Sequence, residues 1–233
     1  MARTDFQRSI DSAARRHKQA GIELDRVRRL AAQNDMAGAF GCAFAFEAEV
    51  EKLALLARSL PAYTGHPKAA QLVEQVLEET IPVEMGYSPA GWFCLRIPSL
   101  LPKKGSGSPV YIQDYLYPAM RRFFQDKQPT LYPQSVLVFR HIYEASRPER
   151  AYRDHDNIEL NRVADILALY LLPDDAPLRC AHYYCSAVGD TDRTEVYVVP
   201  RGLFPIWLAA ENRGELEEDL LYETCQKAPE KHT

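Results

Sequence analysis

Apolar positions recur at helical spacing through the first 60 residues of the chain. The positions that follow this spacing are Phe6, Ile10, Ala13, Ala14, Ile22, Leu24, Val27, Leu30 and Ala31. No proline occurs before Pro61, and a break near 34–41 precedes a second apolar run over 43–60. The pattern predicts a helical hairpin and then a third helix over 67–80, which begins at a proline. Residues 1–85 are therefore predicted to form an all-helical arm.

Beyond Pro82 the pattern changes to aromatic and β-branched residues that alternate with turn residues, as in strands. This part of the sequence predicts strands over 91–97, 135–144, 178–187 and 194–200, and helices over 112–126 and 158–172. The first of these helices is expected to begin at or after Pro118, and 188–193 to join the last two strands as a hairpin. We expect an α+β domain over 86–205, with packed helices on a small mixed sheet, and an acidic, partly helical tail over 206–233.

Composition narrows the class of protein. The chain has 233 residues, of which 46% are hydrophobic, and no apolar run approaches the roughly 18 residues of a membrane span. With no signal-peptide-like stretch at the start either, we expect a cytoplasmic protein that contacts no membrane. Five cysteines are an odd number at uneven spacings, so reduced thiols are expected. The sequence holds no phosphate-binding loop, no zinc-protease helix motif and no nucleophile elbow, which removes the simplest support for those enzyme classes.

Charge is unevenly distributed along the chain. The net charge is −4, yet residues 96–153 hold 10 Lys+Arg against 4 Asp+Glu (net +6), and 154–233 hold 7 against 16 (net −9). A basic segment therefore runs directly into an acidic one. Two basic clusters also lie in the arm, over 15–18 and 26–29; they suit DNA phosphates or a solvated helix face.

The junction of the two segments carries the candidate chemistry. In an extended segment Asp154 and Asp156 would point to the same side, and their repulsion would be relieved by a cation such as Mg²⁺ or Mn²⁺. Asn157 is placed to cap the helix that follows. Asp174 and Asp175 come after that helix and would approach the first pair if the helix packs back across the sheet. The alternative, which the spacing leaves open, is an Asx turn at the first pair and a solvated turn at the second.

The motif Asp154-His-Asp-Asn157, the later Asp165 and the pair Asp174-Asp175 resemble RusA-type Holliday junction resolvases over roughly residues 90–200. This resemblance implies a Mg²⁺-dependent, structure-selective endonuclease that acts on branched DNA as a homodimer. It implies that the metal-binding, catalytic carboxylates are Asp154, Asp156 and Asp175. The supporting residues would be Asn157, Asn161, Asp165 and Asp174. The residues that hold the DNA backbone would be Lys103, Lys104, Arg150 and Arg153.

One departure from the family's pattern opens an alternative. RusA-type proteins place a lysine in the first turns of the motif helix, whereas this chain has Leu160 and Asn161 there. The loss of this positive charge favours a catalytically inactive module of RusA fold that binds DNA or another protein. The sequence also resembles bacterial proteins that add a helical N-terminal region to the RusA-like half. A further alternative is a structural helical adaptor whose acidic turns have no chemical role.

Overall fold

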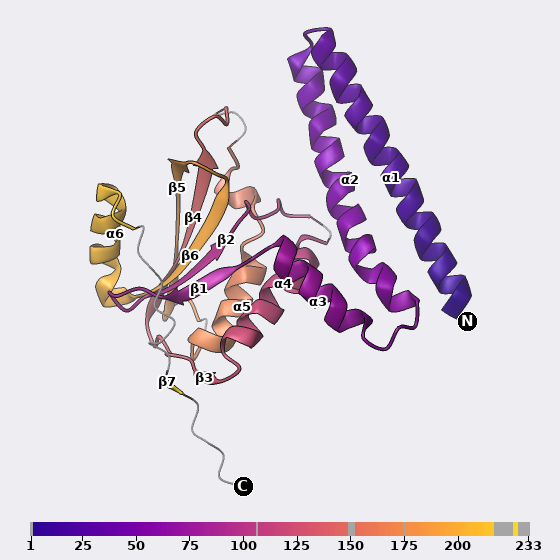
Figure 1. Cartoon of the computed structure of the whole chain (residues 1–233). Coiled ribbons are helices and arrows are strands. Elements are labelled where there is room, and N and C mark those ends of the chain that lie inside the picture. Colours follow the sequence, from indigo (N-terminus) through magenta and orange to yellow (C-terminus); the bar gives the residue numbers. More distant parts are fainter. Residues whose placement is uncertain (1, 106, 149–151, 175, 217–225, 228–233) are drawn as a thin grey trace. The chain divides into compact units, whose positions relative to one another are not determined.

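The computed structural model of the protein describes residues 2–105, 107–148, 152–174, 176–216 and 226–227. The chain divides into two compact units (Figure 1). The first comprises Met1–Val76 and Ser106–Tyr111, and the second comprises Leu77–Gly105 and Ile112–Thr233. Helices and a mixed five-stranded sheet together confirm the predicted α+β class.

The first unit is built on a helical hairpin, which confirms the prediction from the apolar spacing. Helix α1 (Ala2–Ala32) and helix α2 (Met36–Tyr63) run side by side, and a third helix, α3 (Ala69–Thr80), follows (Figure 1). The connection between α1 and α2 is shorter than the predicted break, because Asp35 accepts a hydrogen bond from the Gly38 N–H (2.9 Å) and starts the second helix there. Arg16 and Glu49 form an ion pair across the hairpin (2.9 Å).

The second unit is centred on a sheet whose strands lie in the order β1-β2-β6-β4-β5. These strands are β1 (Glu84–Tyr87), β2 (Phe93–Ile97), β4 (Ser135–Glu144), β5 (Cys180–Gly189) and β6 (Arg193–Pro200). Strands β4 and β5 are parallel, and the other neighbours are antiparallel. A separate two-residue pair joins β3 (Lys127–Gln128) to β7 (Gln226–Lys227).

Helices cover both faces of the sheet. Helix α6 (Phe204–Arg213) packs its Trp207 against Val138 and Tyr197 on one face. Helices α4 (Ser108–Phe123) and α5 (Asn161–Leu171) lie on the other face (Figure 1). A line of rings from Phe93 through Phe124 to Tyr170 joins that face to both helices. Successive side chains of β4 therefore pack into a core on either face of the sheet, so the strand is buried on both sides.

The predicted hairpin between the last two long strands is wrong. Strands β5 and β6 do not pair, because β4 lies between them. The loop over 190–192 instead crosses the end of β4, where the Ala145 N–H donates to the Gly189 carbonyl and the Glu144 N–H to Asp192 Oδ1 (both 2.9 Å). Helix α5 is the crossover that makes β4 and β5 parallel, and a parallel pair needs such a connection.

One further prediction is wrong, and two elements were not predicted. Helix α4 begins at Ser108 rather than near Pro118, which lies inside the helix, because Ile112, Leu116 and Met120 form its buried face. Strand β1 and helix α6 were not predicted, and the acidic helix expected within the tail lies, from residue 217 on, outside the described residues. Within the described part of the chain, none of the helices combines the length and apolarity that a membrane span requires.

Candidate functional site

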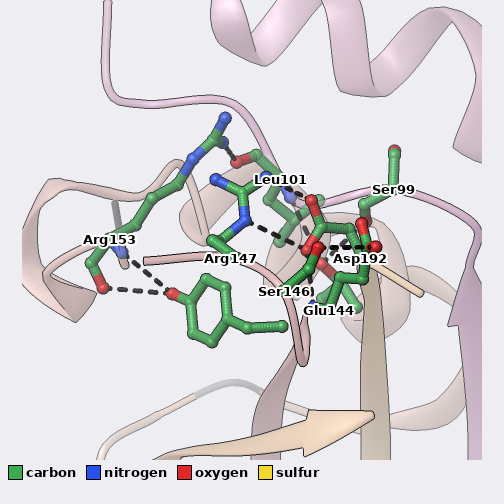
Figure 2. Close-up of polar contacts among 9 residues, drawn as sticks. Ser99, Leu101, Glu144, Ser146, Arg147, Arg153 and Asp192 are labelled. Atoms are coloured by element: carbon green, nitrogen blue, oxygen red, sulfur yellow. Dashed lines mark hydrogen bonds and ion pairs between the residues drawn. The ribbon is translucent and has the colours of Figure 1, made fainter. Parts of the chain in front are cut away.

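Three connecting segments meet at one end of the sheet, where β2, β4 and β5 end and β6 begins. They span residues 98–105, 145–158 and 190–192. The hydroxyl of Thr194 donates to the Ser99 carbonyl (2.9 Å) and accepts from the Leu101 N–H (3.2 Å), which fixes the first segment on β6. Figure 2 shows the polar contacts that join the three segments. This is the end of the sheet at which the acidic motif lies.

Arg147 and Asp192 form an ion pair in this cluster (Figure 2). The Asp192 carboxylate accepts from two nitrogens of the Arg147 guanidinium, one of them Nε at 3.2 Å, and from the Glu144 N–H at 2.9 Å. Burial raises the pKa of Asp192, but the bonds from Arg147 and from the Glu144 N–H outweigh it and lower the pKa below the ordinary value. The pair therefore ties the segment after β4 to the loop before β6.

Arg153, a predicted DNA contact, has a structural role at this end of the sheet. Its guanidinium donates to the Leu101 carbonyl, and its backbone N–H donates to the Tyr143 hydroxyl (3.0 Å; Figure 2). Tyr143 in turn stacks on Tyr152 with ring centroids 4.3 Å apart. The side chain of Arg153 is half-buried. These bonds hold the start of the acidic motif against the segment that carries Lys103 and Lys104.

The acidic motif is a turn, and the extended arrangement, one of the two that the sequence left open, is wrong. Residues His155–Asn157 form a 3₁₀ turn, closed by a hydrogen bond from the Asn157 N–H to the Asp154 carbonyl (3.0 Å). Asp154 and Asp156 are both exposed. Asp156 lies within the turn, and Asp154, the residue before it, has extended backbone angles. Asn157 does not cap α5, whose N-cap position is Leu160.

The basic segment and the acidic motif lie against each other. Lys103 forms an antiparallel bridge with Ile158, the Lys104 N–H donates to the Asn157 carbonyl, and the Glu159 N–H donates to the Pro102 carbonyl (both 2.9 Å). Lys104 is exposed and Lys103 is partly exposed. Backbone pairing therefore brings two predicted phosphate contacts to the motif that carries two predicted metal ligands.

His155 anchors the motif on the sheet through a contact that sequence reasoning missed. Its Nε2 lies 2.9 Å from the Ser186 hydroxyl on β5, and its ring centroid lies 5.8 Å from that of His141 on β4 and 6.0 Å from that of Tyr184. Alternation places His141 between Phe139 and Tyr143 on the face that α5 covers. These ring side chains at alternate positions of β4 were the sequence feature that could have indicated a contact with the segment after the strand.

His141 is the most deeply buried titratable group beside the motif. Its side chain is 0% exposed, and among the described residues neither ring nitrogen has a hydrogen-bond partner. Burial, with the positive charges of His155 and Arg153, lowers the pKa of His141 to about 4. His141 is therefore neutral at physiological pH and acts as a stacking surface for His155.

The remaining acidic candidates lie along α5 or beyond it. Asp165 is exposed and pairs with Arg162 (3.7 Å), and Asn161 is exposed at the first helical position. Asp174 follows the helix, and its carboxylate accepts from the Ala176 N–H (3.0 Å) in an Asx-type turn. Asp154 and Asp156 precede a helix of 11 residues, which spans about 16 Å. One chain therefore does not bring Asp174 to the first pair.

Two predicted site residues, Arg150 and Asp175, lie outside the described residues. Among the residues that the structure does describe, no group of three or more His, Cys, Asp or Glu side chains is arranged to hold a metal ion. One chain thus offers, from its described residues, an exposed pair of carboxylates beside two lysines, and a third carboxylate at the far end of α5.

Comparison with known proteins supplies a family but no activity. A search of the curated proteins finds no match to the chain. The model of a family described as a family of unknown function (DUF6100) matches residues 2–224. This match spans both the helical unit and the sheet unit, so the arm and the α+β unit belong to the same family pattern.

Proposed function

The chain belongs to a family of unknown function (DUF6100), and we propose that its activity is that of a Mg²⁺-dependent, structure-selective endonuclease of branched DNA, similar to the RusA-type resolvases. The observation that carries the proposal is the pairing of residues 102–104 with 157–159. It brings cationic side chains that suit DNA phosphates to carboxylates that suit a divalent cation. Neither set alone would indicate phosphodiester chemistry.

The donor set fits a hard divalent cation. Asp154 and Asp156 are exposed carboxylates three positions and one position before Asn157, in a turn that is anchored by His155 and Arg153. Mg²⁺ is usually held by one or two carboxylates and keeps several waters, so it does not require a complete protein cage. When bound, the ion would lower the pKa of a water and neutralise charge on the scissile phosphate. Lys103 and Lys104 would bind flanking phosphates.

Branched DNA is the substrate that the proposal names, and the protein would act on it in the cytoplasm. Four described cysteines, Cys42, Cys94, Cys180 and Cys185, are free thiols, which fits a reducing compartment. A four-way junction has two-fold symmetry, so a homodimer with two equivalent sites would make the paired cuts that resolve it.

A second candidate function is a module that binds branched DNA without cutting it. The observation that favours it is the side chain of Leu160, which is 6% exposed and lies at the N-cap of α5. A buried leucine supplies no charge to a phosphate at the position where the RusA-type pattern has a lysine. Asn161, exposed in the first turn, offers only a neutral amide.

Cleavage of labelled four-way, flap and linear DNA with Mg²⁺ or Mn²⁺ tests the proposal. We expect cutting of the branched substrates by the wild type and a loss on the order of 100-fold or more in Asp156→Asn. Asp126→Asn is the matched control, because Asp126 is an exposed aspartate of the same unit outside the motif. Metal-independent junction binding without cutting by any variant would instead establish the binding module.

A further inference from the structure

Strand β5 forms one edge of the five-stranded sheet (Figure 1), and its side chains alternate between the two faces. On the face that His155 contacts, the exposed residues of β5 are His182, Tyr184, Ser186 and Val188. The ten residues of the strand include no charged side chain. The row therefore presents rings and uncharged side chains to solvent beside the acidic motif.

Tyr184 is exposed although its ring is held in place. The ring centroid of Tyr184 lies 5.7 Å from that of Phe139 on β4, 6.0 Å from that of His155 and 6.2 Å from that of His182. The Tyr184 hydroxyl also lies 3.2 Å from Nδ1 of His182. Even so, Tyr184 is 40% exposed. A ring that is already fixed loses little conformational entropy when a ligand binds against it, so this ring is a preorganised contact surface.

Two cationic side chains lie next to the row. The Lys104 N–H donates to the carbonyl of Asn157 (2.9 Å), two residues after His155, whose ring contacts Tyr184. Lys104 is exposed, and Lys103 is partly exposed. Sites for single-stranded nucleic acid combine rings on which bases stack with cations that follow the phosphates. An apolar protein surface would match the rings but would leave the lysines without a counter-charge.

Base pairing decides which form of DNA could use the ring. Inside a duplex, the neighbouring base pairs cover both faces of each base, so a side chain reaches a base face only at an end. An unpaired strand exposes its base faces, and an aromatic side chain can then replace a neighbouring base in the stack. Unstacking also costs least for a base that is already unpaired. A flap or an open branch point offers such bases.

We propose that Tyr184 stacks on an unpaired base of a DNA strand, and that Lys103 and Lys104 bind the phosphates of that strand. His155 and His182 support the ring from either side. The inference rests on the proposed function for DNA as the partner and on the fixed, exposed ring for its geometry. It names the feature of branched DNA that the protein recognises, which is an unpaired base.

Affinity measurements in EDTA and at low salt test the stacking without any cleavage. We expect the wild type to bind a labelled single strand, and Tyr184→Leu to bind it about tenfold more weakly, while affinity for a blunt duplex changes by less than about twofold. Tyr184→Phe keeps a ring and should retain the wild-type affinity. Repulsion of the phosphates by Asp154 and Asp156 is the same in all of these proteins, so their comparison isolates the ring.

Tyr117→Leu is the matched control, because Tyr117 is a tyrosine of the same unit that is 38% exposed on α4, away from the row. Its single-strand affinity should equal that of the wild type. Unchanged single-strand affinity in Tyr184→Leu would overturn the stacking. So would a loss in Tyr184→Phe as large as that in Tyr184→Leu, because the hydroxyl rather than the ring would then make the contact.

A fluorescent side chain at the same position reports on stacking directly. Trp92 and Trp207 are 3% and 0% exposed, so the two native indoles are shielded from a ligand. Tyr184→Trp therefore adds one exposed indole on the row. A single strand should quench its emission, because a stacked base quenches an indole, whereas a blunt duplex should not. Unchanged emission at saturating single strand would overturn the proposal even if Tyr184→Leu fails to fold.

The stacking and the nuclease fail separately in these experiments. Ring-dependent binding and quenching by single strands, without Mg²⁺-dependent cleavage of any branched DNA, would refute only the nuclease. Cleavage of branched DNA by Tyr184→Leu at the wild-type rate would leave the nuclease standing and refute the stacking as its means of recognition.

Discussion

Carboxylates near the two faces of strand β4 differ in burial and in their partners. On the α6 face, Glu195 is 3% exposed and accepts hydrogen bonds from Arg140 (2.9 Å), Arg193 (2.9 Å) and the Tyr197 hydroxyl (2.8 Å). On the α5 face, Asp154 and Asp156 are exposed in a turn that is anchored by His155 and Arg153. The first carboxylate is fully occupied by partners within the protein, whereas the second pair is available to a ligand. Substitutions should therefore separate a stability role from a binding role.

The largest effect on stability is expected from Glu195→Gln. Burial raises the pKa of Glu195, but bonds from Arg193, Tyr197 and Arg140 hold it below the ordinary value, so the carboxylate is charged. Its loss removes the buried negative charge that Arg140 and Arg193 share, although Arg140 still lies 3.5 Å from Glu211, and we expect a decrease of about 3–4 kcal/mol in the free energy of unfolding. Urea denaturation measures this. A decrease smaller than about 1 kcal/mol would mean that the network is not a stability element.

A smaller effect, which depends on pH, is expected from His141→Phe. The pKa of His141 is about 4 in the folded protein against an ordinary 6.5, so the unfolded chain takes up a proton that the folded chain does not. The stability contribution is therefore complete above about pH 6.5 and declines as the pH falls toward 4, by about 3 kcal/mol at most. The phenylalanine variant should lack this decline. Urea denaturation of both proteins at pH 7 and at pH 4.5 measures this difference. An equal decrease in the free energy of unfolding between the two pH values for both proteins would contradict the prediction.

Next in size is Asp192→Asn, which weakens the link between the loops at the end of the sheet. Asp192 binds Arg147 through partly buried side chains, and we expect a loss of about 1–2 kcal/mol. Because these loops position the motif, Mn²⁺ affinity should fall as well, though Asp192 does not touch the proposed ion. Glu215→Gln, at an exposed ion pair with Arg213, is the control and should change neither quantity.

The smallest effect on stability is expected from Asp154→Asn. Its side chain is exposed and lies near Asp156, so removal of its charge should leave the free energy of unfolding within about 0.5 kcal/mol of wild type. Mn²⁺ binding should nevertheless be lost. Calorimetric titration and urea denaturation on the same preparation test both statements together. A large loss of stability with unchanged Mn²⁺ binding would show that Asp154 stabilises the fold, as Glu195 does, and does not bind the ion.

The parts of the fold that depend on local pattern were predictable. Strand β4 was predicted with the bounds that the structure has, because an apolar run flanked by polar residues indicates a strand buried on both faces. The helical hairpin of the first unit follows from helical spacing in the same way. Local pattern does not indicate which strand pairs with which, and the supposed hairpin between β5 and β6 failed because β4 inserts between them.

The candidate site was predictable only in its composition. The sequence identified Lys103, Lys104, Asp154 and Asp156, but not that backbone pairing at Ile158 would place them together. It also left open whether Asp174 would approach the first pair, a question that only the path of α5 answers. A turn at the motif was left open, but the contact of His155 with Ser186, between residues 31 positions apart, could not be predicted from local pattern.

Strand β6 lies between β2 and β4, although it comes later in the chain than both. The segment with the lysines follows β2 and the acidic motif follows β4, so the two are held at one end of the sheet only after Arg193–Pro200 has inserted between their strands. During synthesis, this insertion must wait until residue 200 has left the ribosome. A nascent or truncated chain that ends before β6 would contain every proposed phosphate and metal contact, but the proposed site would assemble only once β6 is present.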